Sequence, residues 1–375
     1  MAKGLTRMDR AYLRFRGAAK KSRILKLLFV FACRILRKDL NQKIRKELPK
    51  AVETFVPDDR KKDGKYIKKL EKDIIENGFL YSVSPSEYFL LGFETLNDRE
   101  KLSFVGDYEK GWLCQRLGKL RSVKIWGDKF KIYQFFRPYY RREAISIKAP
   151  GDAEALFDFI KKHNGAILKE VDSSMGKGVT LVRNDPEEMK RCWDSISDSL
   201  QKGTAYIAEE LIRQSAETAV FHPKSVNTVR VMTFRTRDEA AILGAVFRIG
   251  RGDSVVDNAG SGGMIAEINP ETGLVIGDAI TEAGEKFASH PDSGTRIDGA
   301  ALPKWEELLE LSKTLASMLP DQKYVGWDLA LTDQGWVMVE ANSRAQFINQ
   351  YPNRIGMRER VRKYFYPELG LTKDY

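Results

Sequence analysis

Two carboxylates and an amide in the last quarter of the chain have the types and spacing of a magnesium site. Asp328 lies in an apolar run that the turn 332–335 joins to a second run containing Glu340 and Asn342. If the runs pair as a hairpin, Asp328 lies near Glu340, and Glu340 and Asn342 point to one face. Mg²⁺ takes a few hard oxygen ligands and completes its octahedron with phosphate and water. An acid-capped hairpin is the alternative, but acids on a buried strand without a counter-ion are costly.

A small-residue loop follows a strand-like run that carries Lys169. The loop, residues 172–179, reads DSSMGKGV. Its glycines let backbone N–H groups close over an anion, and a strand lysine can reach a phosphate as a point charge. It is not a P-loop, because the G-x-x-x-x-G-K-[ST] pattern does not occur. The segment predicts a phosphate-binding loop, although a glycine-rich hairpin turn fits it equally well.

Two further sets of residues could bind the rest of a nucleotide and an acceptor. The run 205–212 leads into paired acids at Glu209 and Glu210, which suits an adenine edge held by backbone groups beside a ribose. Solvated acids at a strand end are the alternative. Arg230 and Arg248 could clamp a carboxylate and a transferring phosphoryl group, although charge on a strand surface would be unremarkable.

The elements that must position these residues follow from periodicity. Predicted strands cover 166–170, 180–183, 205–212, 228–235, 241–249, 324–331 and 336–340, and a helix covers 303–319. A linker followed by a helix is expected over 51–75, and short helices over 76–124. The body is therefore α+β with mostly antiparallel sheets, and 375 residues suffice for two or three subdomains.

Charge and composition narrow the function classes. Residues 1–50 hold 16 Lys or Arg against 3 acids, whereas the remainder holds 47 basic and 49 acidic residues. A basic groove for nucleic acid through the catalytic body is therefore not expected. Three cysteines without ligand spacing and no secretory pattern favour a reducing cytoplasm. No Ser-His-Asp or Cys-His arrangement is suggested, which disfavours covalent hydrolase chemistry.

The basic segment contains one amphipathic run, residues 24–36, too short to span a bilayer, which takes roughly 20 apolar residues. On a helix its basic residues cluster on one side: Arg23, Lys26, Arg34, Arg37 and Lys38. The opposite side carries Leu25, Leu28, Phe29, Phe31, Ala32 and Leu36. Such a helix either packs its apolar face on the rest of the protein or lies on an anionic membrane through residues 20–40.

Taken together, these residues resemble the ATP-grasp superfamily, most closely its sugar-transfer-associated branch, over roughly residues 100–360. The carrying segments are GAILKEVDSSMGKGV, EELIRQ, SVNTVRVMTF, DNAGSGGMIAEINPETG and VGWDLALTDQGWVMVEAN. The resemblance implies two α+β subdomains that clasp ATP between mostly antiparallel sheets. It places a basic helical N-terminal extension and linker at 1–75, a helical pre-ATP-grasp region at 76–124 and the catalytic domain at 125–365.

The resemblance also implies residue roles. The nucleotide would be held by Lys129, Lys169, Ser173, Ser174, Gly176, Lys177, Gly178, Glu209, Glu210, Leu211 and Ile212. The acceptor would be held by Asn227, Arg230, Asn258, Gly262 and Gly263. Arg248, on the γ-phosphate, and Arg230 would be catalytic, and Asp328, Glu340 and Asn342 would hold Mg²⁺. One departure is Gln214-Ser215, where the branch tends to have a histidine.

The implied reaction is ATP- and Mg²⁺-dependent amide formation between a carboxylate, such as a carboxylated sugar or related metabolite, and an amine or amino acid through an acyl phosphate. Polysaccharide biosynthesis, a lipid-linked sugar acceptor and a cytoplasmic location, peripheral at the inner membrane face, are parts of the same expectation. Two alternatives stay open: a kinase that phosphorylates a hydroxyl, and a nucleotide-binding module without catalysis.

Overall fold

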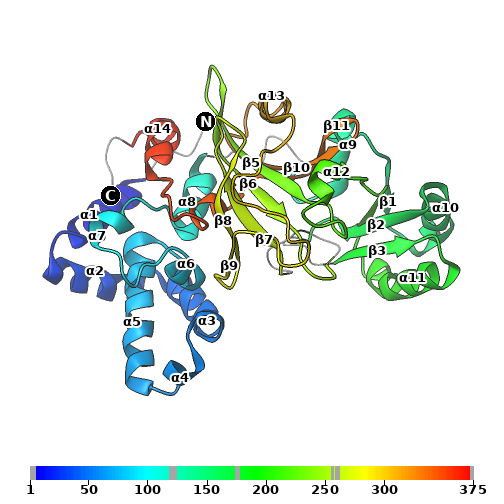
Figure 1. Cartoon of the computed structure of the whole chain (residues 1–375). Helices are drawn as coiled ribbons and strands as arrows, with labels where there is room; N and C mark the ends of the chain where they lie inside the picture. Colours follow the sequence, from blue (N-terminus) through cyan, green and yellow to red (C-terminus); the bar gives the residue numbers. More distant parts are fainter. Residues whose placement is uncertain (1–5, 118–124, 174–177, 255–256, 258–261, 372–375) are drawn as a thin grey trace.

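The computed structural model describes residues 6–117, 125–173, 178–254, 257 and 262–371. Two antiparallel sheets form its centre and one end, and helices gather at the other end (Figure 1). The larger sheet has the order β11-β10-β5-β6-β7-β8-β9. Its strands are β5 (Thr228–Arg235), β6 (Ala240–Ile249), β7 (Met264–Ile268), β8 (Val275–Thr281), β9 (Lys286–Phe287), β10 (Tyr324–Thr332) and β11 (Gly335–Asn342). The predicted α+β class with antiparallel sheets is confirmed.

The smaller sheet has the order β1-β4-β2-β3. Its strands are β1 (Ala144–Ile147), β2 (Gly165–Glu170), β3 (Val179–Arg183) and β4 (Tyr206–Glu209). Helices α10 (Ala153–His163) and α11 (Pro186–Gln201) pack on it and bury a core that includes Ile160, Leu168 and Ala208. Because side chains alternate along each strand, this core leaves the opposite sheet face for polar groups.

One face of the larger sheet is apolar and packs on α9 (Lys129–Tyr140) and α13 (Trp305–Ser317). Alternate residues of β5, β6 and β10, among them Val229, Phe247 and Trp327, are fully buried there. Trp327 meets Phe136 of α9 edge to face at 5.5 Å between ring centroids. This packing fixes which residues of the same strands point to the other face.

The other face of the larger sheet is covered by the N-terminal helices. These are α1 (Arg7–Ala19), α2 (Arg23–Leu36), α3 (Lys38–Phe55), α4 (Asp58–Lys61), α5 (Gly64–Tyr81), α6 (Pro85–Leu90), α7 (Asp98–Lys101) and α8 (Asp107–Leu117). They share a core with Val246, Ile265 and Ile280 of the sheet. Residues 51–75, expected to hold a linker, are mostly helical, because α3 runs on to Phe55 and α5 begins at Gly64.

The chain is completed by short elements and a C-terminal helix. They are η1 (Pro150–Asp152), α12 (Ala216–Ala219), η3 (Ile348–Gln350) and α14 (Arg358–Leu369). Arg358 binds the buried Glu109 of α8 through two nitrogen–oxygen contacts of 2.6 and 3.1 Å. Burial opposes ionisation of Glu109, but Arg358 and Arg16 hold the pKa of its carboxyl at about 2. The N-terminal helices are thus ion-paired to the chain that follows the larger sheet.

Gly356 tests how closely these two parts of the chain pack. A Cβ atom at Gly356 would lie 2.0 Å from the backbone oxygen of Ser103, which also accepts a hydrogen bond from the Arg358 N–H. We predict that Gly356→Ala lowers the free energy of unfolding by about 1–3 kcal/mol, the usual cost of overpacking, measured by urea denaturation. The control is Gly64→Ala at the start of α5, where a Cβ meets nothing within 4 Å. Equal stability of the two variants would contradict direct backbone packing at Gly356.

Candidate active site

Four charged side chains form a row across the larger sheet. Asp328 of β10 lies directly opposite Glu340 of β11 on one side and Arg230 of β5 on the other. Directly opposite residues share a sheet face. Arg248 of β6 joins them, because it lies two residues beyond Val246, the partner of Arg230. The predicted pairing of Asp328 with Glu340 is therefore observed, and the row faces the N-terminal helices.

Asp328 is the centre of this row and is only 2% exposed. Arg230 binds it in a bidentate pair, with both nitrogen–oxygen distances 2.6 Å, and Arg248 adds a contact of 2.9 Å. Burial would raise the pKa of Asp328, but the two guanidinium groups hold it below its ordinary value. Asp328 is therefore an ionised group that holds both arginines in fixed positions.

Glu340 and Asn342 complete an oxygen-rich group beside Asp328. The Glu340 carboxylate makes no hydrogen bond or ion pair with any described residue, and burial and the charge of Asp328 raise its pKa. The Asn342 amide lies 3.4 Å from Asp328. An unpartnered carboxylate beside an ionised one suits a cation, and this donor set is of the kind Mg²⁺ prefers. Across the described ranges no group of three His, Cys, Asp or Glu side chains could hold a metal ion. The predicted ligand set contains only two such side chains, because its third member is the Asn342 amide.

Asp257 is a site residue that the sequence did not reveal. It is buried, lies 3.3 Å from the second guanidinium nitrogen of Arg248 and accepts a hydrogen bond from the Thr228 hydroxyl. Burial, together with Asp328, raises the pKa of Asp257. Arg248 is thus held between two acids from separate segments. Asp257 lies in a loop without periodicity, so no local pattern indicated this contact.

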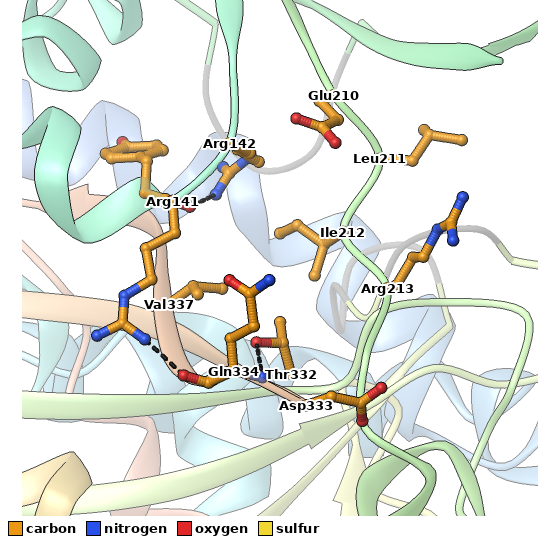
Figure 2. Close-up of a pocket in the computed structure, with 11 residues that line it drawn as sticks. Arg141, Arg142, Glu210, Leu211, Ile212, Arg213, Thr332, Asp333, Gln334 and Val337 are labelled. Atoms are coloured by element: carbon orange, nitrogen blue, oxygen red, sulfur yellow. Dashed lines mark hydrogen bonds between the residues drawn. The ribbon is translucent and has the colours of Figure 1, made fainter. Parts of the chain in front are cut away.

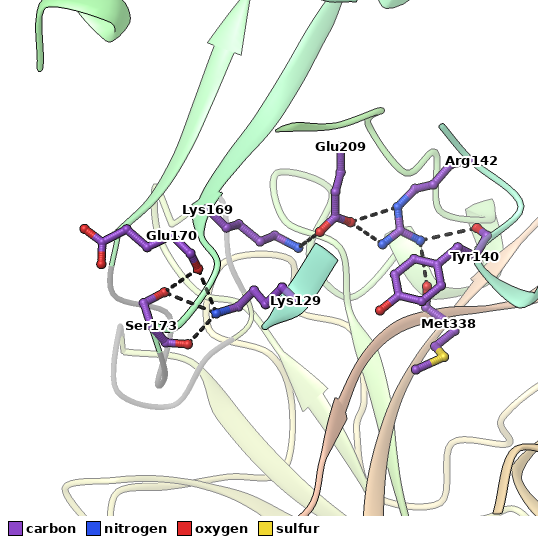
Figure 3. A network of polar contacts seen from close by, with 8 residues as sticks. All are labelled: Lys129, Tyr140, Arg142, Lys169, Glu170, Ser173, Glu209 and Met338. Carbon is purple, nitrogen blue, oxygen red and sulfur yellow. Dashed lines mark hydrogen bonds and ion pairs between the residues drawn. The ribbon is translucent and has the colours of Figure 1, made fainter. Parts of the chain in front are cut away.

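The predicted phosphate-binding lysines come together at the end of the smaller sheet (Figure 3). The Lys129 amine donates hydrogen bonds to the Glu170 carbonyl at 3.0 Å and to the Ser173 hydroxyl at 3.2 Å. The Lys169 amine lies 2.9 Å from Glu209. Burial, with Lys169 nearby, lowers the pKa of Lys129. Two cations beside the loop after β2 form a place for an anion.

Arg142, which sequence reasoning missed, joins the two sheets (Figure 3). Its guanidinium lies 3.0 Å from Glu209 of β4 and donates a hydrogen bond of 2.6 Å to the Met338 carbonyl of β11. Glu209 is buried; burial opposes its ionisation, but Lys169 and Arg142 hold the pKa of its carboxyl at about 2. The Glu209 carboxylate therefore binds Arg142 and Lys169. Its contact with a ribose stays a prediction.

A cavity of about 110 Å³ lies between the sheets, lined by apolar and charged groups. Ile167, Val179, Ile212 and Val339 form the apolar part, with Lys169 and Asp257 at its polar ends. A second cavity, of about 210 Å³, lies where residues 210–213 face the turn 332–334 (Figure 2). An apolar slot with lysine at one end has the character expected for a purine and its phosphates.

A further cavity, of about 280 Å³, lies on the opposite side of the charged row. Arg230 and Arg248 open into it, and its remaining wall comes largely from N-terminal helices and the loops next to them, including Lys43, Ser84 and Tyr108. Arg230 and Arg248 therefore line this cavity directly, whereas the apolar cavity approaches the row through Asp257, the partner of Arg248.

Asn227 connects the segment that precedes β5 through hydrogen bonds of its side-chain amide. It is 1% exposed, and its amide nitrogen donates to Gln214 Oε1 at 3.1 Å and to the carbonyls of Thr218 and His222 at 2.9 and 3.0 Å. Its oxygen accepts from the Gly250 N–H at 3.2 Å. Gln214, the departure noted in the sequence, is its partner in this network, and the substrate role of Asn227 stays a prediction.

The remaining predicted residues lie along the same cleft or outside the described ranges. Glu210, Leu211 and Ile212 line the cavity in Figure 2. Gly178, next to β3, and Gly262, next to β7, adopt left-handed φ angles of 69° and 90°. Gly263 lies between Gly262 and the first residue of β7. Ser174, Gly176, Lys177 and Asn258 fall outside the residues that the structure describes.

Two antiparallel sheets closing on a cleft, with Lys169 from the smaller sheet, Lys129 from α9, and carboxylates and arginines from the larger sheet, have the ATP-grasp architecture. The chain belongs to the sugar-transfer associated ATP-grasp family, whose profile matches residues 121–364. Comparison with curated protein sequences finds no match.

Similar solved structures are ATP-grasp ligases with low identity. The ADP complex of PurK, N5-carboxyaminoimidazole ribonucleotide synthetase, is 11% identical with a TM-score of 0.44, over 72% of this chain and 60% of that one. The D-alanine–D-alanine ligase from Bacillus anthracis is 13% identical with a TM-score of 0.41, over 70% and 73%. The D-cycloserine synthetase DcsG is 15% identical with a TM-score of 0.42, over 76% and 81%.

The Arg142–Glu209 pair yields a prediction with a defined pH dependence. Arg142→Met should lower the free energy of unfolding at neutral pH by about 3–5 kcal/mol, because it leaves a buried carboxylate short of a partner. The folded-state pKa of Glu209 is depressed from 4.5 to about 2. The stabilisation is therefore present above pH 4.5 and is lost as pH falls toward 2.

Urea denaturation at several pH values checks this prediction. The difference between wild type and Arg142→Met should shrink as the pH is lowered through that window. Adding Glu209→Gln to the variant should recover part of the loss, since no buried carboxylate is then left short of a partner. Arg141→Met is the matched control: Arg141 is exposed and donates to the Gln334 carbonyl. A difference that is independent of pH would contradict the ionic origin of the effect.

Proposed function

We propose that this protein is an ATP-dependent ligase that joins a carboxylate to an amine through an acyl phosphate. The supporting observation is that the two arginines of the charged row line a polar cavity, while Asp257, the partner of Arg248, lines an apolar cavity suited to a nucleotide. A phosphoryl group transferred across the row would pass from one cavity to the other.

ATP would lie with its adenine in the apolar cavity and its phosphates toward Lys129 and Lys169. Asp328, Glu340 and Asn342 would hold Mg²⁺, which supplies positive charge to the phosphate oxygens. Arg248 and Arg230, kept in place by Asp328, would bind the γ-phosphate and the acceptor carboxylate. The residues present therefore do two things: they orient the two anions and neutralise their mutual repulsion.

The reaction needs no nucleophile from the protein. A carboxylate oxygen of the acceptor attacks the γ-phosphorus, and the bond to the bridging oxygen breaks, which gives an acyl phosphate and ADP. The amine nitrogen then attacks the acyl carbon and loses a proton, and phosphate leaves with the electron pair of its carbon–oxygen bond. Arginines beside the phosphoryl group stabilise the negative charge that both steps carry.

The polar cavity supports a hydroxyl-rich carboxylate as acceptor. Hydroxyl, amide and charged groups line it, among them Ser84, Tyr108 and Gln346. A carboxylated sugar has one anion for the arginines and several hydroxyls for such partners. The proposed role in polysaccharide biosynthesis rests on the family's description as sugar-transfer associated. Such an association does not define the reaction mechanism.

The first test is ADP release and ³¹P product analysis with Mg-ATP and a panel of uronic acids and amino acids, offered singly and in pairs. We predict turnover only with both a carboxylate and an amine. Asp328→Asn and Glu340→Gln should each lower kcat/KM at least about a hundredfold, a loss of about 2.7 kcal/mol of transition-state stabilisation. Arg183→Gln, at an exposed arginine of β3 whose side chain is 69% exposed, is the control and should keep full activity.

The same assay separates the alternatives. A stable phosphorylated product formed without an amine would identify a kinase and overturn the ligase proposal. ATP binding without ADP release from any substrate pair would instead favour a nucleotide-binding module.

A second prediction concerns the polar cavity. Ser86 is an exposed residue on its wall, and Ser86→Trp should obstruct the cavity without burying new polar groups. The KM for the carboxylate should rise about tenfold or more, since lost positioning carries this order of cost. ATP affinity, measured by calorimetry, should stay unchanged. A change in ATP affinity with an unchanged KM for the carboxylate would show that the acceptor binds elsewhere.

A further inference from the structure

Helix α2 carries an apolar stripe that the protein leaves uncovered. Ile24, Leu27, Leu28, Phe31 and Ile35 are 71%, 58%, 53%, 65% and 51% exposed, at spacings of three, one, three and four residues that place them on one side of the helix. Elsewhere in the described chain, large apolar side chains with comparable exposure are scattered singly, which is ordinary for a surface. A continuous stripe one helix long therefore needs an explanation.

Packing of α2 on the protein is achieved by a different side of the helix. Phe29, Val30 and Cys33 are buried in the core of the N-terminal helices, and Phe29 meets Tyr12 and Phe15 of α1 at 5.5 and 5.2 Å between ring centroids. The sequence grouped Phe29 with Leu28 and Phe31 on one apolar side. The structure divides that group, so the exposed stripe contributes nothing to the packing of α2.

The charge around the stripe is mostly positive. Residues 6–38 hold 11 Lys or Arg and one acid, Asp9, and Asp9 is paired with Arg116 at 2.8 Å. Arg23 and Arg34 are exposed on α2 beside the stripe, and Arg10 and Arg14 are exposed on α1. Lys26 and Arg16 are not part of this surface, because they pair with Glu76 and Glu109.

We infer that α2 lies flat on an anionic membrane, with the stripe among the acyl chains and Arg23 and Arg34 at the lipid phosphates. The cores of protein interfaces are depleted in charged residues, whereas a narrow apolar stripe bordered by cations is typical of helices at lipid surfaces. Within the described residues no helix is long and apolar enough to cross a bilayer, which agrees with contact at the surface. This inference is independent of the proposed reaction.

Vesicle flotation of the full chain tests the inference. The protein should float with vesicles of phosphatidylcholine and phosphatidylglycerol, float less with phosphatidylcholine alone, and be released by salt, which screens the lipid charge. Leu28→Ser with Phe31→Ser should lower the partition coefficient at least about tenfold, because two of the five inserted apolar side chains are lost. Arg23→Gln with Arg34→Gln should lower binding to the anionic vesicles alone.

The matched control is Val220→Ser with Leu274→Ser, which removes two apolar side chains, 52% and 42% exposed, far from α2 in the sequence. It should bind vesicles as wild type does, and circular dichroism should show all variants folded. Absence of flotation, or equal flotation of the stripe variant, would overturn the inference. So would a concentration-dependent dimer that Phe31→Ser abolishes in protein that binds no vesicles, since a second copy would then cover the stripe.

Discussion

The bidentate pair between Arg230 and Asp328 is the interaction on which the geometry of the site depends. Two buried charges are costly unless each is fully partnered, so strands β5 and β10 must keep the register that brings them together. That register also fixes Glu340 on β11 and Arg248 on β6, because opposite residues share a face. A β-bulge directly after Asp328 shifts the register with β11, and pairing resumes at Leu329 and Met338; bulges are common next to functional sites. The same ion pair therefore keeps the predicted metal ligands and the two arginines within reach of one another.

A second ionic group connects the two sheets. Arg142 reaches Glu209 of the smaller sheet and the Met338 carbonyl of the larger one, while Lys169 binds the other oxygen of Glu209. Lys169 is one of the two lysines predicted to bind phosphate. Its position is thus tied to the same carboxylate that holds the sheets together, so under the proposed function the closing of the cleft and the placing of a phosphate-binding lysine are coupled.

The sequence predicted what depends on local pattern. Alternation predicted β2 to β6, β10 and β11 and, with the tight turn, the hairpin that pairs Asp328 with Glu340, whereas β1, β7, β8 and β9 were not predicted. Arg142 was missed because its partners Glu209 and Met338 lie 67 and 196 residues away. Asp257 was missed although Arg248 lies only nine residues away and Thr228 lies 29 away, because nothing in a single arginine or aspartate indicates such contacts. For α2, periodicity showed an amphipathic helix but not which side packs, because apolar residues surround most of its circumference. Only tertiary contacts decide that Phe29 is inside and Phe31 outside.

The region that matches the family and the N-terminal helices line different parts of the candidate site, which bears on substrate specificity. Residues 121–364 match the family and supply the charged row. Much of the polar cavity's wall comes from residues before this region, including Lys43, Ser84 and Tyr108, and those helices are fixed to the sheet by a shared core. Under the proposed function, the family region would therefore supply phosphoryl transfer and the N-terminal helices would select the acceptor. Because α2 belongs to the same helical group, a membrane-bound α2 would place the acceptor-selecting part of the protein beside the lipid surface.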